Sequence, residues 1–314
     1  MTNGRVYSVS VKEGGKATIN NSLFFCYFAH LTGGVIDGPA SANFYNGGYN
    51  QGIRTYSSPN TAYYNIGMTF AKYYDAYVVV QDGPPAIDLD MTLGTLRNSA
   101  KRLLKQGVGT VVFGNGSSHF NNEGIDKVGF VIEDGRAIFN NATGSGAGKN
   151  RMQVNGGATI GGTGFLGGDS AYTNFNVLVK GSSVDSLASV EPGSVDPVSG
   201  ESLIGTLTVG GITNMNCVTF GDHSRLNLQI GLDGEADQLM VHGTLDLSSE
   251  LDGLSLTIDP DAKAGTYVLV EATEGIVGTF DVLPEDFFKP ALLKYTATTI
   301  EYTVPQMGTL FLFK

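Results

Sequence analysis

Short apolar runs of strand length recur along most of the chain. Each run is rich in β-branched and aromatic residues and is bounded by Gly, Asn, Asp or Ser, which is the pattern of strands separated by tight turns. Clear examples are Tyr77–Val80, Thr110–Phe113, Gly129–Ile132, Arg136–Phe139, Leu207–Val209 and Tyr267–Val270. Many turns contain Gly-Gly, Asn-Gly or Asp-Gly pairs, and glycine supplies the backbone conformations that sharp corners require. The pattern predicts an all-β chain.

The order of these elements separates a solenoid from a hairpin sandwich. From about residue 104 onward a strand, a Gly or Asn corner and a second strand return at loosely regular intervals. Such units stack at the ~4.8 Å spacing of paired strands, and their inward apolar residues merge into one core. The first hundred residues follow this pattern less clearly. We therefore predict a β-solenoid for the later part and extrapolate it to the earlier part.

The composition limits the classes of partner. The chain has 314 residues, 44 of them Gly, a charged fraction of 16% and a formal net charge of -11. An apolar fraction of 41% argues against disorder. Nucleic acid is excluded as a partner because its phosphates require clustered basic residues, and the densest group is only Lys101, Arg102 and Lys105. No apolar segment reaches the ~18 residues of a transmembrane helix.

The cysteines and the first residues bear on the compartment. Cys26 and Cys217 lie far apart in sequence, so we expect coils too distant for a disulfide and a buried free thiol at Cys26. Residues 1–5 show no basic segment followed by an apolar one, as a secretory signal would. Either the protein is intracellular or Met1 begins a piece of a longer exported chain, and we favour the second.

Two stretches carry a more specific pattern. Residues 104–115 read Leu-Lys-Gln-Gly-Val-Gly-Thr-Val-Val-Phe-Gly-Asn, and residues 154–164 read Val-Asn-Gly-Gly-Ala-Thr-Ile-Gly-Gly-Thr-Gly. Both, together with the strand pairs between them and later strings up to residue 280, resemble the repeat of autotransporter-associated β-strand proteins. The resemblance covers about residues 104–280, and the first hundred residues contain no comparable string.

The resemblance implies a fold and a domain plan. It implies a single right-handed parallel β-helix of the pectin-lyase-like kind, with a C-terminal cap. It also makes residues 102–106 the entry to a strand, although Asn98–Gly107 alone has the capping residues and composition of a short helix. The expected regions are N-terminal coils with Tyr-rich lateral loops at 1–103, repeat coils at 104–181, a Pro/Ser-rich loop at 182–205, further coils at 206–283 and the cap at 284–314.

Catalytic and metal chemistry has weak support in the sequence. The four histidines are not spaced as metal ligands. Weak Ca²⁺ candidates are Asp233, Glu235 and Asp237, which a solvated turn also explains. Asp88 and Asp90 alternate with apolar residues, so both would project from one strand face as an acid/base pair or as an ordinary polar face. We predict no enzyme activity, no catalytic residues, no metal and no cofactor.

A dense group of tyrosines is the main feature outside the repeat. Tyrosine suits sugar stacking or protein contacts because it is amphipathic and has few rotatable bonds. It equally suits packing of a lateral loop or an aromatic ladder inside the solenoid. The candidate binding residues are Tyr45, Tyr49, Tyr56, Tyr63, Tyr64, Tyr73 and Tyr74.

Three functions follow from these observations. The first is a non-catalytic structural protein, extracellular or on the bacterial outer surface, that self-associates into a fibre, coat or matrix. The second is an adhesin that binds glycans or host surfaces through the Tyr-rich region. The third is a polysaccharide-cleaving β-helix enzyme. The expected partners are the protein itself, other surface proteins or glycans.

Overall fold

The computed structural model describes residues 5–21, 23–25, 27–46, 51–70, 74–98, 101–114, 128–148, 151–167, 175–211, 216–283 and 292–306. Within these ranges the chain forms strands joined by turns and contains no α-helix. The all-β prediction is confirmed for this part of the chain. Leu103–Gln106 is a strand, as the repeat pattern predicted, and the local helical signal around it is overridden.

The strands assemble into four large sheets and one hairpin. Sheet A contains β1 (Arg5–Val6), β4 (Leu23–Phe25), β7 (Asn43–Asn46), β10 (Gly67–Phe70) and β13 (Thr95–Asn98). Sheet B contains β2 (Val9–Val11), β5 (Phe28–Leu31), β8 (Gln51–Thr55), β11 (Ala76–Val79), β14 (Leu103–Gln106), β16 (Val128–Ile132), β18 (Arg151–Val154), β21 (Asn176–Val179), β26 (Asn216–Phe220), β29 (Gly243–Leu247) and β32 (Gly275–Gly278).

Two further large sheets complete the molecule. Sheet C contains β3 (Lys16–Thr18), β6 (Val35–Asp37), β9 (Ala62–Tyr64), β12 (Leu89–Met91), β15 (Thr110–Phe113), β17 (Gly135–Phe139), β19 (Ala158–Gly162), β22 (Ala188–Pro192), β27 (Ser224–Ile230) and β30 (Gly253–Ile258). Sheet D contains β20 (Phe165–Leu166), β25 (Thr206–Val209), β28 (Gln238–Val241), β31 (Gly265–Ala272), β34 (Thr299–Val304) and β33 (Leu293–Tyr295). The hairpin joins β23 (Ser194–Val195) to β24 (Ser202–Leu203).

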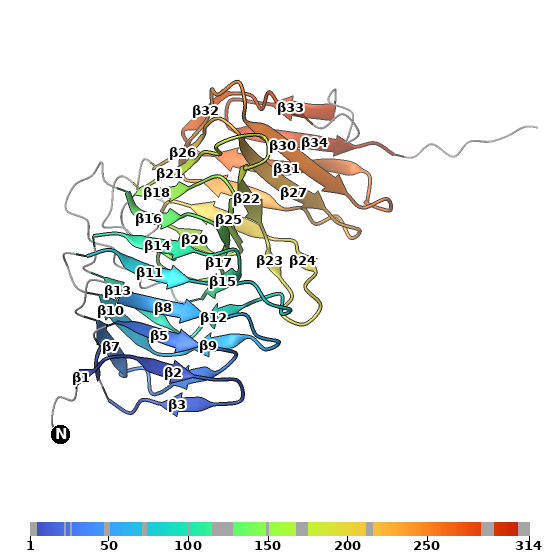
Figure 1. Cartoon of the computed structure of the whole chain (residues 1–314). Coiled ribbons are helices and arrows are strands. Elements are labelled where there is room, and N and C mark those ends of the chain that lie inside the picture. Colours follow the sequence, from blue (N-terminus) through green and yellow to red (C-terminus); the bar gives the residue numbers. More distant parts are fainter. Residues whose placement is uncertain are drawn as a thin grey trace, which may run out of the picture.

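The chain visits the sheets in a fixed order. It passes from A to B to C in the coils up to β15, and from B to C to D in the coils from β18 onward, so A and D occupy the same place in the cycle. Between these parts, β16 and β17 belong to B and C with no described strand of A or D beside them in the chain. Neighbouring strands of A, B and C are parallel, and successive coils stack from the N-terminal end upward (Figure 1). This arrangement of long parallel sheets is compatible with a β-solenoid.

The core lies between the sheets and is built from in-register ladders. In sheet B, one inward ladder runs Ala29, Ile53, Val78, Lys105, Ile132, Val154, Val179 and Phe220. Its apolar members are almost fully buried, and burial of each such side chain contributes roughly 1.5–3 kcal/mol. Alternation with period two therefore fixes which residues face the core and leaves the outward rows free for other chemistry.

Gly162 shows why the corners of the coils require glycine. It ends β19 with φ at 122°, and a Cβ atom built there would lie 2.0 Å from the carbonyl oxygen of Phe139 on the coil below. Any larger residue would collide with backbone that cannot move without breaking the stack.

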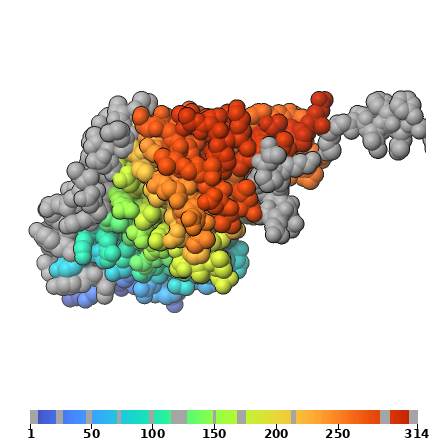
Figure 2. All heavy atoms as spheres, turned by 90° about the horizontal axis from the view of Figure 1, so that it is seen from above, coloured from blue at the N-terminus to red at the C-terminus, as the bar shows by residue number. Residues whose placement is uncertain are grey.

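The two ends of the stack are built differently. At the N-terminal end β1, β2 and β3 each pair with one strand only among the described strands. At the C-terminal end β30 and β32 also pair with one strand each, whereas β34, which lies in the region predicted as a cap at 284–314, pairs antiparallel with both β31 and β33. Viewed from that end, orange and red C-terminal residues form most of the coloured surface (Figure 2). None of the described segments forms a helix long and apolar enough to cross a bilayer.

The region predicted as a Pro/Ser-rich loop, 182–205, contains a strand and the hairpin. β22 belongs to sheet C, and β23 and β24 follow it. Val195 of the hairpin packs on Ile87, Val112 and Ile138, which form a small apolar cluster separate from the main core. The hairpin therefore covers part of the outward face of sheet C.

Candidate functional site

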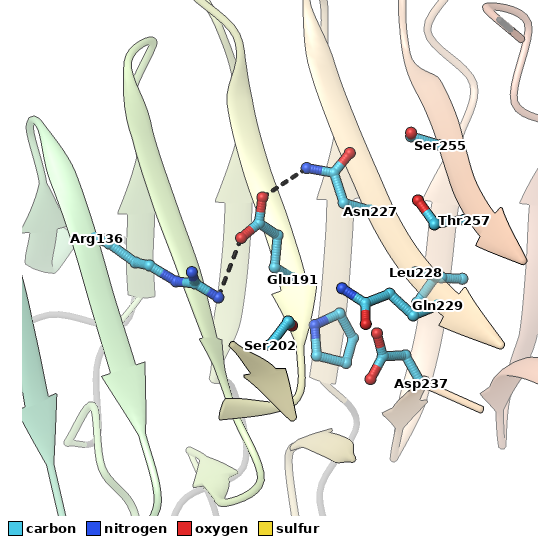
Figure 3. Close-up of a pocket in the computed structure, with 10 residues that line it drawn as sticks. Arg136, Glu191, Ser202, Asn227, Leu228, Gln229, Asp237, Ser255 and Thr257 are labelled. Carbon is cyan, nitrogen blue, oxygen red and sulfur yellow. Dashed lines mark hydrogen bonds and ion pairs between the residues drawn. The ribbon is translucent and has the colours of Figure 1, made fainter. Parts of the chain in front are cut away.

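Next to the hairpin, the outward face of sheet C carries a polar groove. It has a volume of about 390 Å³ and is lined by Arg136, Glu191, Pro192, Ser202, Asn227, Leu228, Gln229, Asp237, Ser255 and Thr257. These residues come from neighbouring strands of the sheet, from β24 and from the corner before β28 (Figure 3). Successive coils thus present hydrogen-bonding groups at the ~4.8 Å spacing of paired strands.

Glu191 is the central side chain of this polar groove. An oxygen of its carboxylate lies 3.2 Å from Nη2 of Arg136, and its other oxygen accepts a 2.7 Å hydrogen bond from Asn227 (Figure 3). Arg136 reaches Glu191 across β19, where Gly161 is the residue in register with Glu191. Because Gly161 has no side chain, it leaves room for this ion pair across the intervening strand.

Asp237 lies at the hairpin side of the polar groove. Its side chain is almost fully buried, and Oδ1 accepts a 2.9 Å hydrogen bond from the backbone N–H of Gly205. Burial raises the pKa of Asp237 to about 7, and the charge of Glu191 acts in the same direction. The polar groove therefore offers carboxyl, guanidinium, amide and hydroxyl groups, which together suit a ligand rich in hydroxyls.

A second groove, the aromatic groove, lies on the outward face of sheet B. It has a volume of about 450 Å³ and is lined by Tyr27, Phe28, Arg54, Tyr77 and Gln106. Gly52 is in register with both Phe28 and Tyr77, so no side chain separates their rings, whose centroids are 6.3 Å apart. The guanidinium carbon of Arg54 lies 4.6 Å from the centroid of the Phe28 ring, a cation–π contact.

A histidine and a tyrosine lie beside the aromatic groove, further along β5 and just after the end of β8. The rings of His30 and Tyr56 stack with centroids 5.8 Å apart, and the Tyr56 hydroxyl lies 3.0 Å from Nδ1 of His30. Burial, followed by the positive charge of Arg54, lowers the pKa of His30. His30 is therefore neutral near pH 7, and Arg54 carries the positive charge of this surface.

The structure distributes the candidate tyrosines over different surfaces. Tyr45 on β7 and Tyr63 on β9 are exposed on sheets A and C, whereas Tyr64 is fully buried and hydrogen-bonded to the carbonyl of Gly67. Tyr56 follows β8 beside the aromatic groove, and Tyr74 precedes β11. Tyr49 and Tyr73 lie outside the described residues.

The sequence did not identify Tyr27, Phe28, Arg54 or Tyr77 as a group. Tyr27 and Phe28 are adjacent in the chain, Arg54 follows Phe28 by 26 residues, and Tyr77 follows Arg54 by 23. They meet only because β5, β8 and β11 pair in register. In the structure Phe28 and His30 are the partly exposed residues of Phe28–Leu31, and the residue types Phe-Ala-His-Leu alone do not show that Phe28 faces outward.

The weak Ca²⁺ candidates have different environments. Asp233 is exposed and lies 3.9 Å from Nζ of Lys263, Glu235 is also exposed, and Asp237 is buried in the polar groove. No group of three or more metal-ligating His, Cys, Asp or Glu side chains occurs in the described ranges.

Asp88 and Asp90 bind different parts of the backbone, the next coil and the local turn. Asp88 is nearly buried and accepts a 2.7 Å hydrogen bond from the N–H of Thr110, whereas Asp90 accepts one of the same length from the N–H of Thr92. Cys217 is a free thiol, and Cys26 lies outside the described residues.

Lys105 of the repeat motif lies in the inward ladder of sheet B. Its ammonium group donates to the carbonyl oxygens of Gly107, Gly109 and Asp134, the last two at 2.7 Å. Burial lowers the pKa of Lys105 to about 8, so it is still charged at pH 7. The motif lysine thus ties two successive corners together, which is a structural role.

Comparison with known protein families and with characterised proteins finds no match for this chain.

Proposed function

We propose that this chain is a right-handed parallel β-helix from the exported part of a bacterial surface protein, with a non-catalytic structural role and a tendency to self-associate. The observation that carries the proposal is the pair of parallel sheets, B and C, that continue from the first coils to the last. A single interior shared by all coils makes a stiff, elongated body, as a fibre, coat or matrix component requires. The resemblance of residues 104–280 to the autotransporter-associated repeat supports the handedness and the extracellular location.

Self-association is supported by the open edge of β2 at the N-terminal end of the stack. In β2, the carbonyl of Val11 accepts from Thr32 at the end of the pairing with β5. Alternate residues of a parallel strand bond to the same neighbour, so the backbone groups of Ser10 point to the unpaired side. Such an edge is a template for a strand of another molecule, and the occupant that we propose is a second copy of this chain.

Sedimentation velocity at increasing concentration, followed by negative-stain microscopy, tests this proposal. Ser10→Pro removes an N–H from the free edge without breaking the pairing with β5, whereas Ser10→Ala keeps that N–H and serves as the control. We expect the wild type and Ser10→Ala to form elongated assemblies and Ser10→Pro to remain monomeric. A wild type that is monomeric at every concentration, or a Ser10→Pro variant that assembles equally well, would contradict self-association.

A second candidate function is glycan binding, and the polar groove favours it. Its guanidinium, carboxyl, amide and hydroxyl groups line successive strands, and its volume of about 390 Å³ is within the range of small-molecule sites. A neutral saccharide lying across the strands of sheet C would find partners for its hydroxyls on each coil.

A glycan array followed by calorimetric titration tests this second function. We expect Asn227→Ala to weaken binding of a neutral oligosaccharide about tenfold, since it removes a groove amide and the partner of Glu191. Gln153→Ala, which removes an amide from sheet B, is the control and should bind as the wild type does. New reducing ends that disappear in Glu191→Gln would instead indicate a polysaccharide-cleaving enzyme and would contradict the non-catalytic proposal.

A further inference from the structure

Arg54 is a cation whose charge the described residues leave uncompensated. No hydrogen bond or ion pair among them engages its guanidinium, and Nε is buried without a hydrogen-bond partner. Its contact is the face of Phe28, at 4.6 Å. In a chain with a formal net charge of -11, an arginine held on an aromatic ring without a carboxylate partner is available to an anionic ligand.

The other charged groups around the aromatic groove already have partners. Asp75 accepts two hydrogen bonds from Arg102, at 3.1 and 2.6 Å, which is the bidentate geometry of a strong ion pair. Glu133 accepts a 2.6 Å hydrogen bond from Gln106. Because Arg102 is already paired with Asp75, Arg54 is the cation lining this groove that can pair with a ligand anion.

The polar and the aromatic residues of the aromatic groove lie in two adjacent outward rows of sheet B. Arg54 and Gln106 belong to one outward row, in which Val79 lies between them. Phe28 and Tyr77 belong to the adjacent row and approach each other over Gly52. A ring with an apolar face can therefore pack on the aromatic row while its anionic substituent reaches Arg54. The amide oxygen of Gln106 can accept a hydrogen bond from a hydroxyl of the same ligand.

We propose that the aromatic groove binds a saccharide that carries a carboxylate. The apolar face of a pyranose ring packs on Phe28 and Tyr77, and the planar carboxylate pairs with the guanidinium of Arg54. The volume of about 450 Å³ accommodates a short oligosaccharide. This site lies on a different sheet from the polar groove and takes a charged ligand, so it is independent of both functions proposed above.

Calorimetric titration with two matched ligands tests the proposal. The probes are a hyaluronan tetrasaccharide and the same tetrasaccharide with its carboxylates reduced to neutral alcohols. We expect the wild type to bind the carboxylated form about tenfold more tightly, and only that preference to weaken as salt is raised. Equal binding of the two forms, or binding of neither, would overturn the proposal.

Three variants locate the effect. Arg54→Gln should abolish the preference for the carboxylated ligand, and Arg54→Lys should restore part of it, because lysine keeps the charge but lacks the planar fork. Arg151→Gln is the matched control: Arg151 is on sheet B outside the groove and also has a buried Nε without a partner. A preference that survives in Arg54→Gln, or that is lost equally in Arg151→Gln, would contradict the assignment to Arg54. Thermal melts confirm that each variant is folded, and self-association should be unchanged in all three.

Discussion

The outward faces of sheets B and C differ in chemistry although the inward residues of both sheets belong to one apolar core. In the early coils the face of sheet B carries the aromatic groove, where Arg54 forms no ion pair with the residues that the structure describes. In the later coils the face of sheet C carries the polar groove, where Glu191 is paired with Arg136 and Asn227. Both faces have a glycine in an outward row, Gly52 or Gly161, on the coil that lies between the two coils whose side chains meet.

This difference shows where a stacked β fold can vary. Inward residues must remain apolar and in register, because each ladder is part of one continuous core. Outward residues contribute little to that core, so neighbouring coils can place aromatic, charged or amide groups in rows without changing the fold. Binding properties therefore depend on the outward rows, and stability depends on the ladders and corners.

The largest expected effect is a loss of stability, and with it of both grooves, when a corner glycine is replaced by a larger residue. Gly162→Ala would place a Cβ about 2.0 Å from the Phe139 carbonyl oxygen at a positive φ. We expect a loss of about 3 kcal/mol or more in the free energy of unfolding, measured by urea denaturation. Gly265→Ala is the control, since the nearest atom, Cε2 of Tyr267, would be 4.0 Å from the new Cβ. An unchanged midpoint in Gly162→Ala would show that the corner can relax.

The next largest effect is a loss of stability when Lys105, the charged residue of the inward ladder in sheet B, is replaced. Lys105→Met keeps a chain of similar length but removes the ammonium donor from the carbonyls of Gly107, Gly109 and Asp134, of which Gly109 keeps a 3.3 Å hydrogen bond from the N–H of Arg136. We expect a loss of about 2–3 kcal/mol, because unsatisfied buried polar groups are costly. The exposed Lys101→Met is the control. If Lys105→Met were as stable as the wild type, the ammonium would not tie these corners together.

A smaller effect is a pH dependence of stability that comes from Asp252, a residue that lines neither groove. Asp252 is fully buried, its Oδ2 has no hydrogen-bond partner, and burial raises its pKa to about 7. The folded state therefore holds a proton more tightly than the unfolded state, and this contribution to stability is present below about pH 4 and lost as pH rises through 7.

Asp252→Asn should remove most of that pH dependence. Asparagine keeps an acceptor for the N–H of Asp281 and introduces no charge. We expect a gain of about 2 kcal/mol at pH 8 and little change at pH 4, measured by thermal melts across this range. The exposed Asp261→Asn is the control. An equal gain at both pH values would rule out titration of Asp252 as the cause.

The smallest effect is a change in stability when the contact between Tyr56 and His30, beside the aromatic groove, is weakened. Tyr56→Phe removes the hydroxyl that lies 3.0 Å from His30 Nδ1 but keeps the stacked ring. We expect a change of about 0.5 kcal/mol in stability and none in the polar groove, because the pair is partly solvated. A change of several kcal/mol would mean that this surface supports the core.

The sequence predicted the architecture better than the binding surfaces. Turn glycines and short β-branched runs were sufficient for an all-β chain, and the motif around Lys105 identified a strand where the local composition indicated a helix. The tyrosines were grouped by proximity in sequence, yet Tyr45, Tyr63 and Tyr64 lie on two sheets and differ in burial. Grooves arise from residues about one coil apart, and only the pairing register shows which of them become neighbours.

The most direct test of the stack that supports both grooves is a distance between spin labels on the outward row of sheet C. Tyr63 on β9 and Ser255 on β30 are the label sites, in a chain whose own Cys26 and Cys217 are replaced by Ser. Successive pairings run through β12, β15, β17, β19, β22 and β27, so a continuous stack separates them by seven strand spacings, about 34 Å at ~4.8 Å each. Moving the first label to Asp90 on β12 should shorten the distance by about 5 Å. A single narrow distribution near 34 Å with that shift is the predicted result, and a short or broad distribution without the shift would contradict a continuous stack.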